Sequence, residues 1–309
     1  MSLTKLILAS LLLAGCTHSS WNAIGTRQLS RQNYSRAVDA FSFAVEAEED
    51  LARSFLLRGY AYLKLGRNSE AITDLQKSLK QRKSFSALWI LGYAYGANGN
   101  TIQAADCFSQ LCNEYPKQPF AYWGYGIYDL FCTEDFNHAS NCFAEAMKLD
   151  DTNVNFMAAY SRALFCVGKT DECMEFLCGK LRNHPKCHTL HLELIAVRLC
   201  SDQNEDPKAL QEIAACLKDL PNASPLKYQL LARLNAKNGD FEKAAANLRR
   251  AIAANQQNDD AFSRIYASSL DDALKEYQNG RLPDAIHEES RRMFLLYAPQ
   301  MLKISENLE

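Results

Sequence analysis

One spacing limits what this chain can fold into: a small residue recurs about every 34 residues. Gly25 and Gly59 are 34 residues apart, and Gly92 follows after a further 33. Around each glycine, large apolar residues recur at intervals of three or four, which is the period of an α-helix with one apolar face. A fixed period of this length indicates repeated pairs of helices, because each pair buries its apolar faces only against its neighbours.

The stretch from Leu88 to Pro116 shows the repeated unit most clearly. Two amphipathic segments in it are joined by a tight turn at 98–100, and a proline closes the unit. This spacing resembles the tetratricopeptide repeat (TPR). In that family the first helix of each unit touches the second closely at a small residue, and the recurring glycines occupy the corresponding position here.

Seven units follow this spacing to different degrees. Four match it well (the first, second, third and seventh), and three match it in part. In the fourth unit, between Gly126 and Ala139, the register of the first helix is open by one residue. In the sixth unit we expect one helix from His188 to Cys200 and a second that begins at Pro207, with a polar loop between them. No segment alternates apolar and polar residues over the length of a typical strand.

The resemblance implies an all-α fold, a right-handed α-solenoid of about seven TPR helix pairs plus C-terminal capping helices. We expect four parts: a lipoprotein signal peptide at 1–15, a lipidated tether at 16–20, the TPR solenoid at 21–258 and a C-terminal helical extension or cap at 259–309. Within the last part, a helix from about 260 to 277 stops at Asn279-Gly280, and a final helix follows it.

The first residues form a targeting segment, which is excluded from reasoning about the fold. An apolar run from 6 to 13 is too short to span a bilayer as a helix. Leu13-Ala14-Gly15-Cys16 then resembles a bacterial lipobox, which implies cleavage before Cys16 and acylation of its thiol. Thr17, in place of an aspartate, implies sorting to the outer membrane, with the folded part on the periplasmic side. The alternative is a plain secretory signal with an incidental cysteine.

In the TPR family the first helices of the units line a concave groove that binds peptides or proteins. The residues at the corresponding positions are Arg53, Tyr60, Lys64, Trp89, Tyr93, Trp123, Tyr128, Arg162, Phe165, Arg233 and Lys237. Tyr, Trp and Arg dominate the energetics of interfaces, so we expect these side chains to bind a partner, with Tyr60, Trp89 and Tyr93 exposed. The alternative is that the aromatic residues pack in the core, because helical spacing alone does not separate the two.

Ten cysteines follow Cys16, all between 107 and 216, and the expected compartment permits disulfides. Disulfide bonding and burial as small apolar residues are both open for them. Four residues of metal-ligand type lie close together in sequence: His184, Cys187, His188 and His191. Because Pro185 interrupts this segment and no CxxC pair accompanies it, we expect a surface turn rather than a zinc site. No metal and no cofactor is expected.

The remaining features favour a binding protein. The formal net charge is −2, from 34 basic and 36 acidic residues, so no excess of positive charge favours nucleic acid. The sequence lacks GxSxG, HExxH, Walker and dinucleotide-binding patterns, so we expect no enzyme. We expect a non-catalytic scaffold for protein–protein interaction instead.

Only a resemblance to other TPR lipoproteins indicates which partner this protein binds. TPR lipoproteins of type IV and tight-adherence pilus systems are similar in having a lipobox followed by about six repeats. This likeness implies a secretin or another envelope-complex component as partner, and a role in assembling an envelope machine. The alternatives are an adaptor that recruits peptidoglycan hydrolases or periplasmic proteases, and a structural lipoprotein with a redox-sensitive middle.

Overall fold

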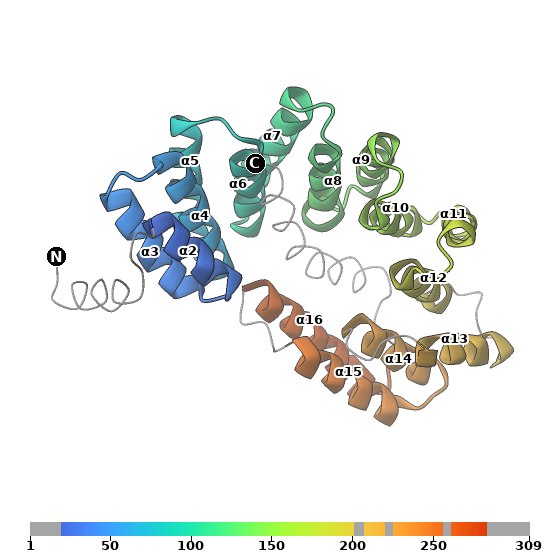
Figure 1. Ribbon diagram of the computed structural model, residues 1–309. Helices are drawn as coiled ribbons and strands as arrows, with labels where there is room; N and C mark the ends of the chain where they lie inside the picture. The colour runs from blue at the N-terminus through green and yellow to red at the C-terminus, as the bar shows by residue number, and fades with distance from the viewer. Residues whose placement is uncertain (1–19, 201–206, 220–224, 256–260, 283–309) are drawn as a thin grey trace. The chain divides into compact units, whose positions relative to one another are not determined.

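The computed structural model describes residues 20–200, 207–219, 225–255 and 261–282. These ranges contain fifteen α-helices, one π-helical turn and no strand (Figure 1). The predicted all-α fold class is therefore confirmed. The expected signal peptide, Cys16, the polar loop at 201–206 and the expected final helix lie outside the described residues. None of the described helices is both long enough and apolar enough to cross a membrane.

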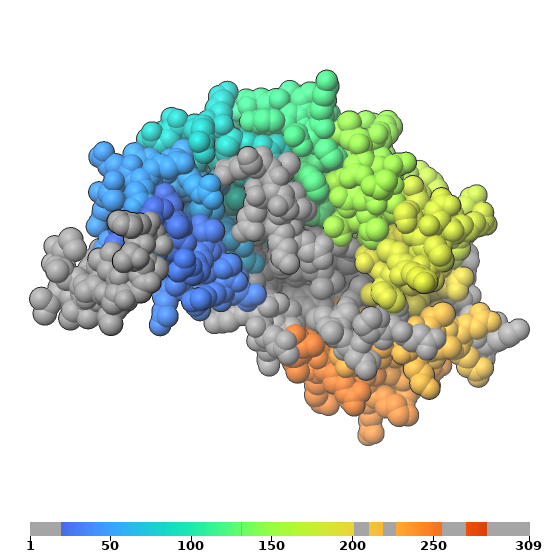
Figure 2. Space-filling view, viewed as in Figure 1, coloured from blue at the N-terminus to red at the C-terminus, as the bar shows by residue number. Residues whose placement is uncertain are grey.

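The chain divides between Asn98 and Gly99 into two units. The helices of the first unit are α2 (Trp21–Ser30), α3 (Tyr34–Glu46), α4 (Leu51–Lys64), α5 (Asn68–Gln81) and α6 (Phe85–Ala97). Each helix contacts the next along the chain, and α2 also contacts α4. In the space-filling view, α2 to α5 form one continuous body of packed side chains (Figure 2).

A buried ion pair adds to the apolar packing of the first unit. Arg58 of α4 binds Asp74 of α5 through two hydrogen bonds, Nε to Oδ2 at 2.6 Å and Nη2 to Oδ1 at 3.0 Å. Its third nitrogen donates to the hydroxyl of Ser42 on α3 at 3.1 Å. A planar guanidinium suits such forked contacts, so one side chain links three consecutive helices.

The second unit continues the same pattern of helices. Its members are α7 (Thr101–Glu114), α8 (Pro119–Tyr128), η1 (Asp129–Thr133), α9 (Phe136–Leu149), α10 (Val154–Cys166), α11 (Thr170–Asn183), α12 (His188–Cys200), α13 (Pro207–Asp219), α14 (Pro225–Lys237), α15 (Phe241–Asn255) and α16 (Ala261–Gln278). The predicted bounds of α12 and the predicted start of α13 are confirmed. The predicted stop of α16 is also confirmed, because Gly280 has a φ of +70° and its N–H donates to the carbonyl of Tyr277.

The recurring glycines allow the two helices of a pair to touch. A Cβ placed on Gly25 would lie 2.5 Å from the ring of Phe41, and one on Gly126 would lie 2.7 Å from the ring of Phe143. Both rings belong to the second helix of the same pair and are fully buried. A larger side chain at either glycine would therefore push the helices apart or displace a packed aromatic ring.

The fourth repeat contains one residue more than its neighbours. In the first three repeats, the glycine precedes the small residue of the second helix by 12 residues, as from Gly25 to Ala37, whereas Gly126 precedes Ala139 by 13. Gly126 nevertheless meets Phe143 as Gly25 meets Phe41. The extra residue falls in the stretch that contains η1, and a π-helical turn accommodates such an insertion without ending the helix pair. The register that the sequence left open by one residue is therefore that of Gly126.

The first helices of the fifth and sixth repeats share a second buried ion pair. Arg162 Nη2 of α10 lies 2.6 Å from Glu193 Oε2 of α12, and each side chain is only 1% exposed. Burying two charges is costly, and the cost is offset only while both partners remain. The pair therefore makes the contact between α10 and α12 sensitive to loss of either side chain.

Two glycine substitutions in the second unit are expected to change stability in opposite directions. Gly126→Ala places its Cβ against Phe143. The cost of overpacking exceeds the gain in helix propensity, so we expect the free energy of unfolding to fall by about 1 kcal/mol or more. Gly179→Ala, on α11, meets nothing within 4 Å and raises it by up to about 1 kcal/mol. Urea unfolding followed by circular dichroism measures both. Equal shifts for the two variants would contradict the close-contact explanation.

Removing one partner of the buried pair is expected to cost more than removing both. Glu193→Leu removes the carboxylate that lies 2.6 Å from the buried Arg162 guanidinium, and it lowers the free energy of unfolding by about 3–5 kcal/mol. The double variant Arg162→Met/Glu193→Leu loses less than the sum of the losses in Arg162→Met and Glu193→Leu, because neither charge of the pair remains buried. The same urea unfolding measures all four proteins, and additive losses would show that the two charges do not interact.

Candidate functional site

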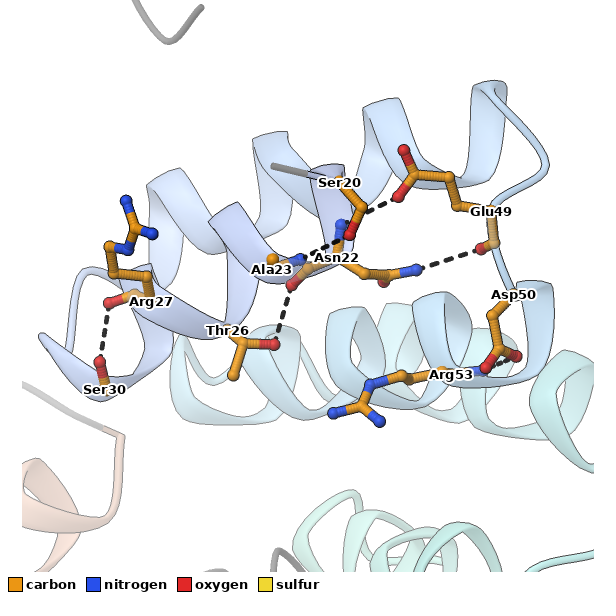
Figure 3. A pocket seen from close by; sticks show the side chains of 9 residues that line it. All are labelled: Ser20, Asn22, Ala23, Thr26, Arg27, Ser30, Glu49, Asp50 and Arg53. Atoms are coloured by element: carbon orange, nitrogen blue, oxygen red, sulfur yellow. Dashed lines mark hydrogen bonds between the residues drawn. The ribbon is translucent and has the colours of Figure 1, made fainter. Parts of the chain in front are cut away.

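A hollow of about 780 Å³ opens on the first helices of the first two repeats. Its wall comes from α2, from α4 and from the connection before α4 (Figure 3). The lining residues are Ser20, Asn22, Ala23, Thr26, Arg27, Ser30, Glu49, Asp50 and Arg53. It lies on the helices that form the binding groove in TPR proteins, and it contains one of the residues predicted to bind a partner, Arg53.

The hollow exists because α2 has small side chains where α4 has large ones. Moving back from Tyr60 and Lys64 by the 34-residue repeat leads to Thr26 and Ser30. Both of these residues line the hollow, and both are short. Short side chains at these two positions therefore help to leave the hollow open.

Hydrogen bonds hold the wall of the hollow in place. The Glu49 carboxylate accepts from the backbone N–H groups of Trp21 and Asn22, at 3.1 Å each, and so caps the start of α2. Asn22 is buried, donates its side-chain amide to the carbonyl of Glu49 at 3.2 Å and accepts from Ser54 at 3.1 Å. These bonds link the N-termini of α2 and α4, and Figure 3 shows the two bonds between Asn22 and Glu49.

The charges around the hollow differ in their local roles. Asp50 caps α4 by accepting from the backbone N–H of Arg53 at 3.2 Å, as Glu49 caps α2. Carboxylates at helix N-termini are stabilised by the helix dipole, so both acids contribute to the structure of the wall. The side chains of Arg27 and Arg53 are exposed at the rim. Their guanidinium groups suit binding of a carboxylate.

The structure places three of the predicted groove residues at least partly in solvent. Arg53 is exposed, and Tyr60 and Lys237 are partly exposed. The other predicted groove residues are buried: Lys64, Trp89, Tyr93, Trp123, Tyr128, Arg162, Phe165 and Arg233. The expectation that Trp89 and Tyr93 are exposed is therefore wrong.

The burial of Trp89 and Tyr93 follows from the composition of α6. All residues from Ser86 to Ala94 are buried, so this helix has no polar face over more than two turns. The two rings stack at a centroid distance of 6.3 Å and an interplanar angle of 4°. Helical spacing places Trp89 and Tyr93 on one face of α6, but it does not show that the other faces are buried as well.

Different contacts bury the remaining predicted residues. The rings of Trp123 and of Phe156 on α10 pack with their centroids 6.1 Å apart. The Tyr128 hydroxyl donates a hydrogen bond to the carbonyl oxygen of Thr101 at 2.7 Å. Arg162 belongs to the ion pair with Glu193. These side chains are buried and support the contacts between helices, although the resemblance implied that they line the binding groove.

The structure also shows the state of the cysteines and the conformation of the histidine-rich segment at 184–191. No disulfide joins the ten cysteines that the structure describes, from Cys107 to Cys216. The segment at 184–187 is a turn between α11 and α12, as predicted, and His191 Nε2 lies 2.9 Å from the carbonyl oxygen of Pro185. Within 184–191, which the structure describes throughout, no three ligand-type side chains come within reach of one ion.

Sequence reasoning missed Thr26 and Ser30, although a signal for them was present. Applying the repeat period to the first unit, as was done for the later ones, leads directly to both positions. What the period does not show is that short side chains there leave a hollow. That depends on how far apart α2 and α4 lie.

Comparison with known proteins agrees with this architecture. A family model described as tetratricopeptide repeat matches residues 22–87 and 56–119, and a second model of that description matches residues 228–258. None of the curated protein sequences matches the chain.

Solved structures of TPR proteins are similar in fold. A tetratricopeptide repeat protein from Parabacteroides merdae has a TM-score of 0.64 at 15% identity, covering 84% of this chain and 98% of that one. The C-terminal part of a TPR protein from Cytophaga hutchinsonii has a TM-score of 0.53 at 13% identity, with the same coverages. A chain of the APC/C hetero-tetramer Cut9–Hcn1 has a TM-score of 0.50 at 16% identity, covering 81% of this chain and 46% of that one.

At such identities the likeness establishes the fold, and the two family models establish the repeats at 22–119 and 228–258. The chain therefore contains tetratricopeptide repeats in these two ranges, and its fold is similar to that of solved tetratricopeptide repeat proteins.

Proposed function

We propose that this protein is a non-catalytic scaffold that binds a peptide or protein partner on the first helices of its repeats, beginning at the hollow between α2 and α4. The TPR fold is typical of protein–protein interaction scaffolds. The matched chain of Cut9–Hcn1 belongs to a hetero-tetramer, so a chain of similar fold is part of an assembly of different subunits. Function depends on the site and not on the fold alone, so the proposal rests on the hollow itself.

The hollow suits a side chain or chain end of a partner. Its volume of about 780 Å³ is large enough for a side chain, and the hydrogen bonds of Glu49, Asn22 and Ser54 hold its wall in place. A site that is already ordered loses little entropy when a ligand binds. Because Arg27 and Arg53 stand at the rim, we propose that the partner presents a carboxylate there.

We further propose that this scaffold lies on the inner face of the bacterial outer membrane, anchored through a lipid on Cys16. Buried lipid methylenes contribute about 0.8 kcal/mol each to such anchoring. Ser20, which lines the hollow, follows Cys16 by only four positions in the sequence. A chain of four residues spans at most about 14 Å, so the hollow would lie close to the membrane surface. This location favours a partner assembled at the membrane, such as a secretin or another component of a pilus system.

Crosslinking from inside the hollow is expected to capture that partner. With a diazirine amino acid no larger than leucine at Thr26, which leaves most of the hollow open, irradiated cells yield a covalent product that contains a secretin or another envelope-complex component. The same amino acid at Thr73, an exposed threonine on the second helix α5, yields no such product. Mass spectrometry of the purified products makes the comparison.

A filled hollow provides the matched loss-of-binding variant. Thr26→Tyr places in the first repeat the residue that the second repeat has at the equivalent position, and it is expected to reduce capture from a second crosslinker at Arg53 at least about tenfold, or 1.4 kcal/mol. Identical products from Thr26 and Thr73, or full capture by the Thr26→Tyr protein, would contradict the site. Capture of a peptidoglycan hydrolase or a periplasmic protease would favour the adaptor role instead.

Lipid attachment is expected at a single cysteine. Cells grown with radiolabelled palmitate label the wild-type protein, and Cys16→Ser removes both the label and the protein's recovery in the membrane fraction. Cys216→Ser, at an exposed cysteine of α13, retains both. Label that persists after Cys16→Ser would contradict the lipid anchor while leaving the binding hollow untouched.

A further inference from the structure

Three side chains of metal-ligand type converge at the one irregular repeat. Asp129 belongs to η1, and His138 and Cys142 follow on α9. One ligand atom from each residue lies within 4.8 Å of the other two. In the part of the chain that the structure describes, this is the only group of three such side chains that could hold one ion.

The insertion in the fourth repeat is what brings Asp129 to this place. π-Helical turns of this kind are rare and occur frequently at functional sites. After η1, Glu134 adopts a left-handed conformation with a φ of 57°, and Asp135 caps α9 by accepting from the N–H of His138 at 2.9 Å. His138 and Cys142 are four residues apart on α9 and therefore share one face of that helix.

The distances are close to those of a coordinated ion. Asp129 Oδ2 lies 2.5 Å from His138 Nδ1, and Cys142 Sγ lies 3.8 Å from the same nitrogen. Zinc bonds of about 2.0 Å to nitrogen and oxygen and 2.3 Å to sulfur, in tetrahedral geometry, hold oxygen and nitrogen about 3.3 Å apart and nitrogen and sulfur about 3.5 Å apart. The oxygen–nitrogen and nitrogen–sulfur separations therefore need to change by under about 1 Å. The His138 side chain is 45% exposed, so it can move without displacing the core.

We propose that Asp129, His138 and Cys142 form a binding site for a divalent transition-metal ion of the zinc class. Carboxylate oxygen, imidazole nitrogen and thiolate sulfur are the three donor types that zinc takes in proteins. A water molecule completes a four-coordinate site. On binding, Cys142 loses its thiol proton to solvent, and the thiolate forms the bond to the metal. The site is independent of the proposed partner surface.

The acidic groups of the cluster have raised pKa values. Burial, and then the negative charge of Asp129, raises the pKa of Cys142 to about 12, and the same two causes raise the pKa of Cys112 to about 11. Burial also raises the pKa of Asp129, although its hydrogen bond with His138 opposes that change. Both thiols are therefore protonated and uncharged at neutral pH without a metal.

The competing explanation is purely structural. Asp129 is only 5% exposed, accepts from the Thr133 hydroxyl at 3.1 Å and contacts His138, so the pair alone could hold η1 and α9 together. Cys142 would then be a small buried residue that lies beside the pair by packing. The two explanations differ in what they predict when metal is added.

Cobalt(II) titration of the full chain distinguishes the two explanations, because a thiolate ligand produces a near-ultraviolet charge-transfer band. We expect the wild-type protein to bind about one cobalt ion with this band, and zinc to displace it. Cys142→Ser removes the band, and His138→Gln and Asp129→Asn each weaken affinity at least about tenfold. The matched controls Cys216→Ser and His188→Gln, both at exposed positions, leave spectrum and affinity unchanged.

Several outcomes would overturn the site. These are a wild-type protein with no charge-transfer band, a band that persists in Cys142→Ser, or a loss of binding that follows His188→Gln instead. Far-ultraviolet circular dichroism checks that each variant is folded. If Cys142→Ser does not fold, His138→Gln decides the question, because its side chain is nearly half exposed and an unchanged affinity in that variant contradicts the proposal.

Discussion

The close approach of the two helices in each pair is the contact on which the other features of this protein depend. At Gly25 and Gly126, the backbone of the first helix lies directly against a buried aromatic ring of the second. Only glycine permits this distance, and the distance in turn sets which side chains face the next pair. Since each pair buries its apolar faces against its neighbours, the same spacing has to recur along the chain.

The fourth repeat shows how strongly this contact is maintained. One extra residue between Gly126 and Ala139 could have shifted the glycine away from Phe143. The contact is kept instead, and the stretch between the two positions contains the π-helical turn η1. The local consequence is a buried carboxylate, Asp129, beside His138 of α9, an arrangement that the regular repeat has no residue to form.

The same repeat position serves different purposes in different units. Tyr60 is partly exposed on α4, and its counterpart Thr26 lines a hollow on α2. Arg162 occupies a first-helix position of the fifth repeat and is buried against Glu193. A family pattern therefore identifies which positions face along the first helices, and the side chain present at each position decides between surface, hollow and core. The hollow between α2 and α4 accordingly lies where the residues are short and not where the aromatic residues gather.

The sequence by itself determined the helices and their period. It predicted α12, the start of α13 and the end of α16, because these depend on local signals such as Pro207 and Asn279-Gly280. Only the tertiary structure decided which side chains are exposed and which residues from different elements come together. Helical spacing shows that Trp89 and Tyr93 share a face, but not whether that face is covered, and α6 proved to be buried on every side. Likewise, Asp129, His138 and Cys142 come together only through the turn of η1, whose geometry no linear spacing expresses.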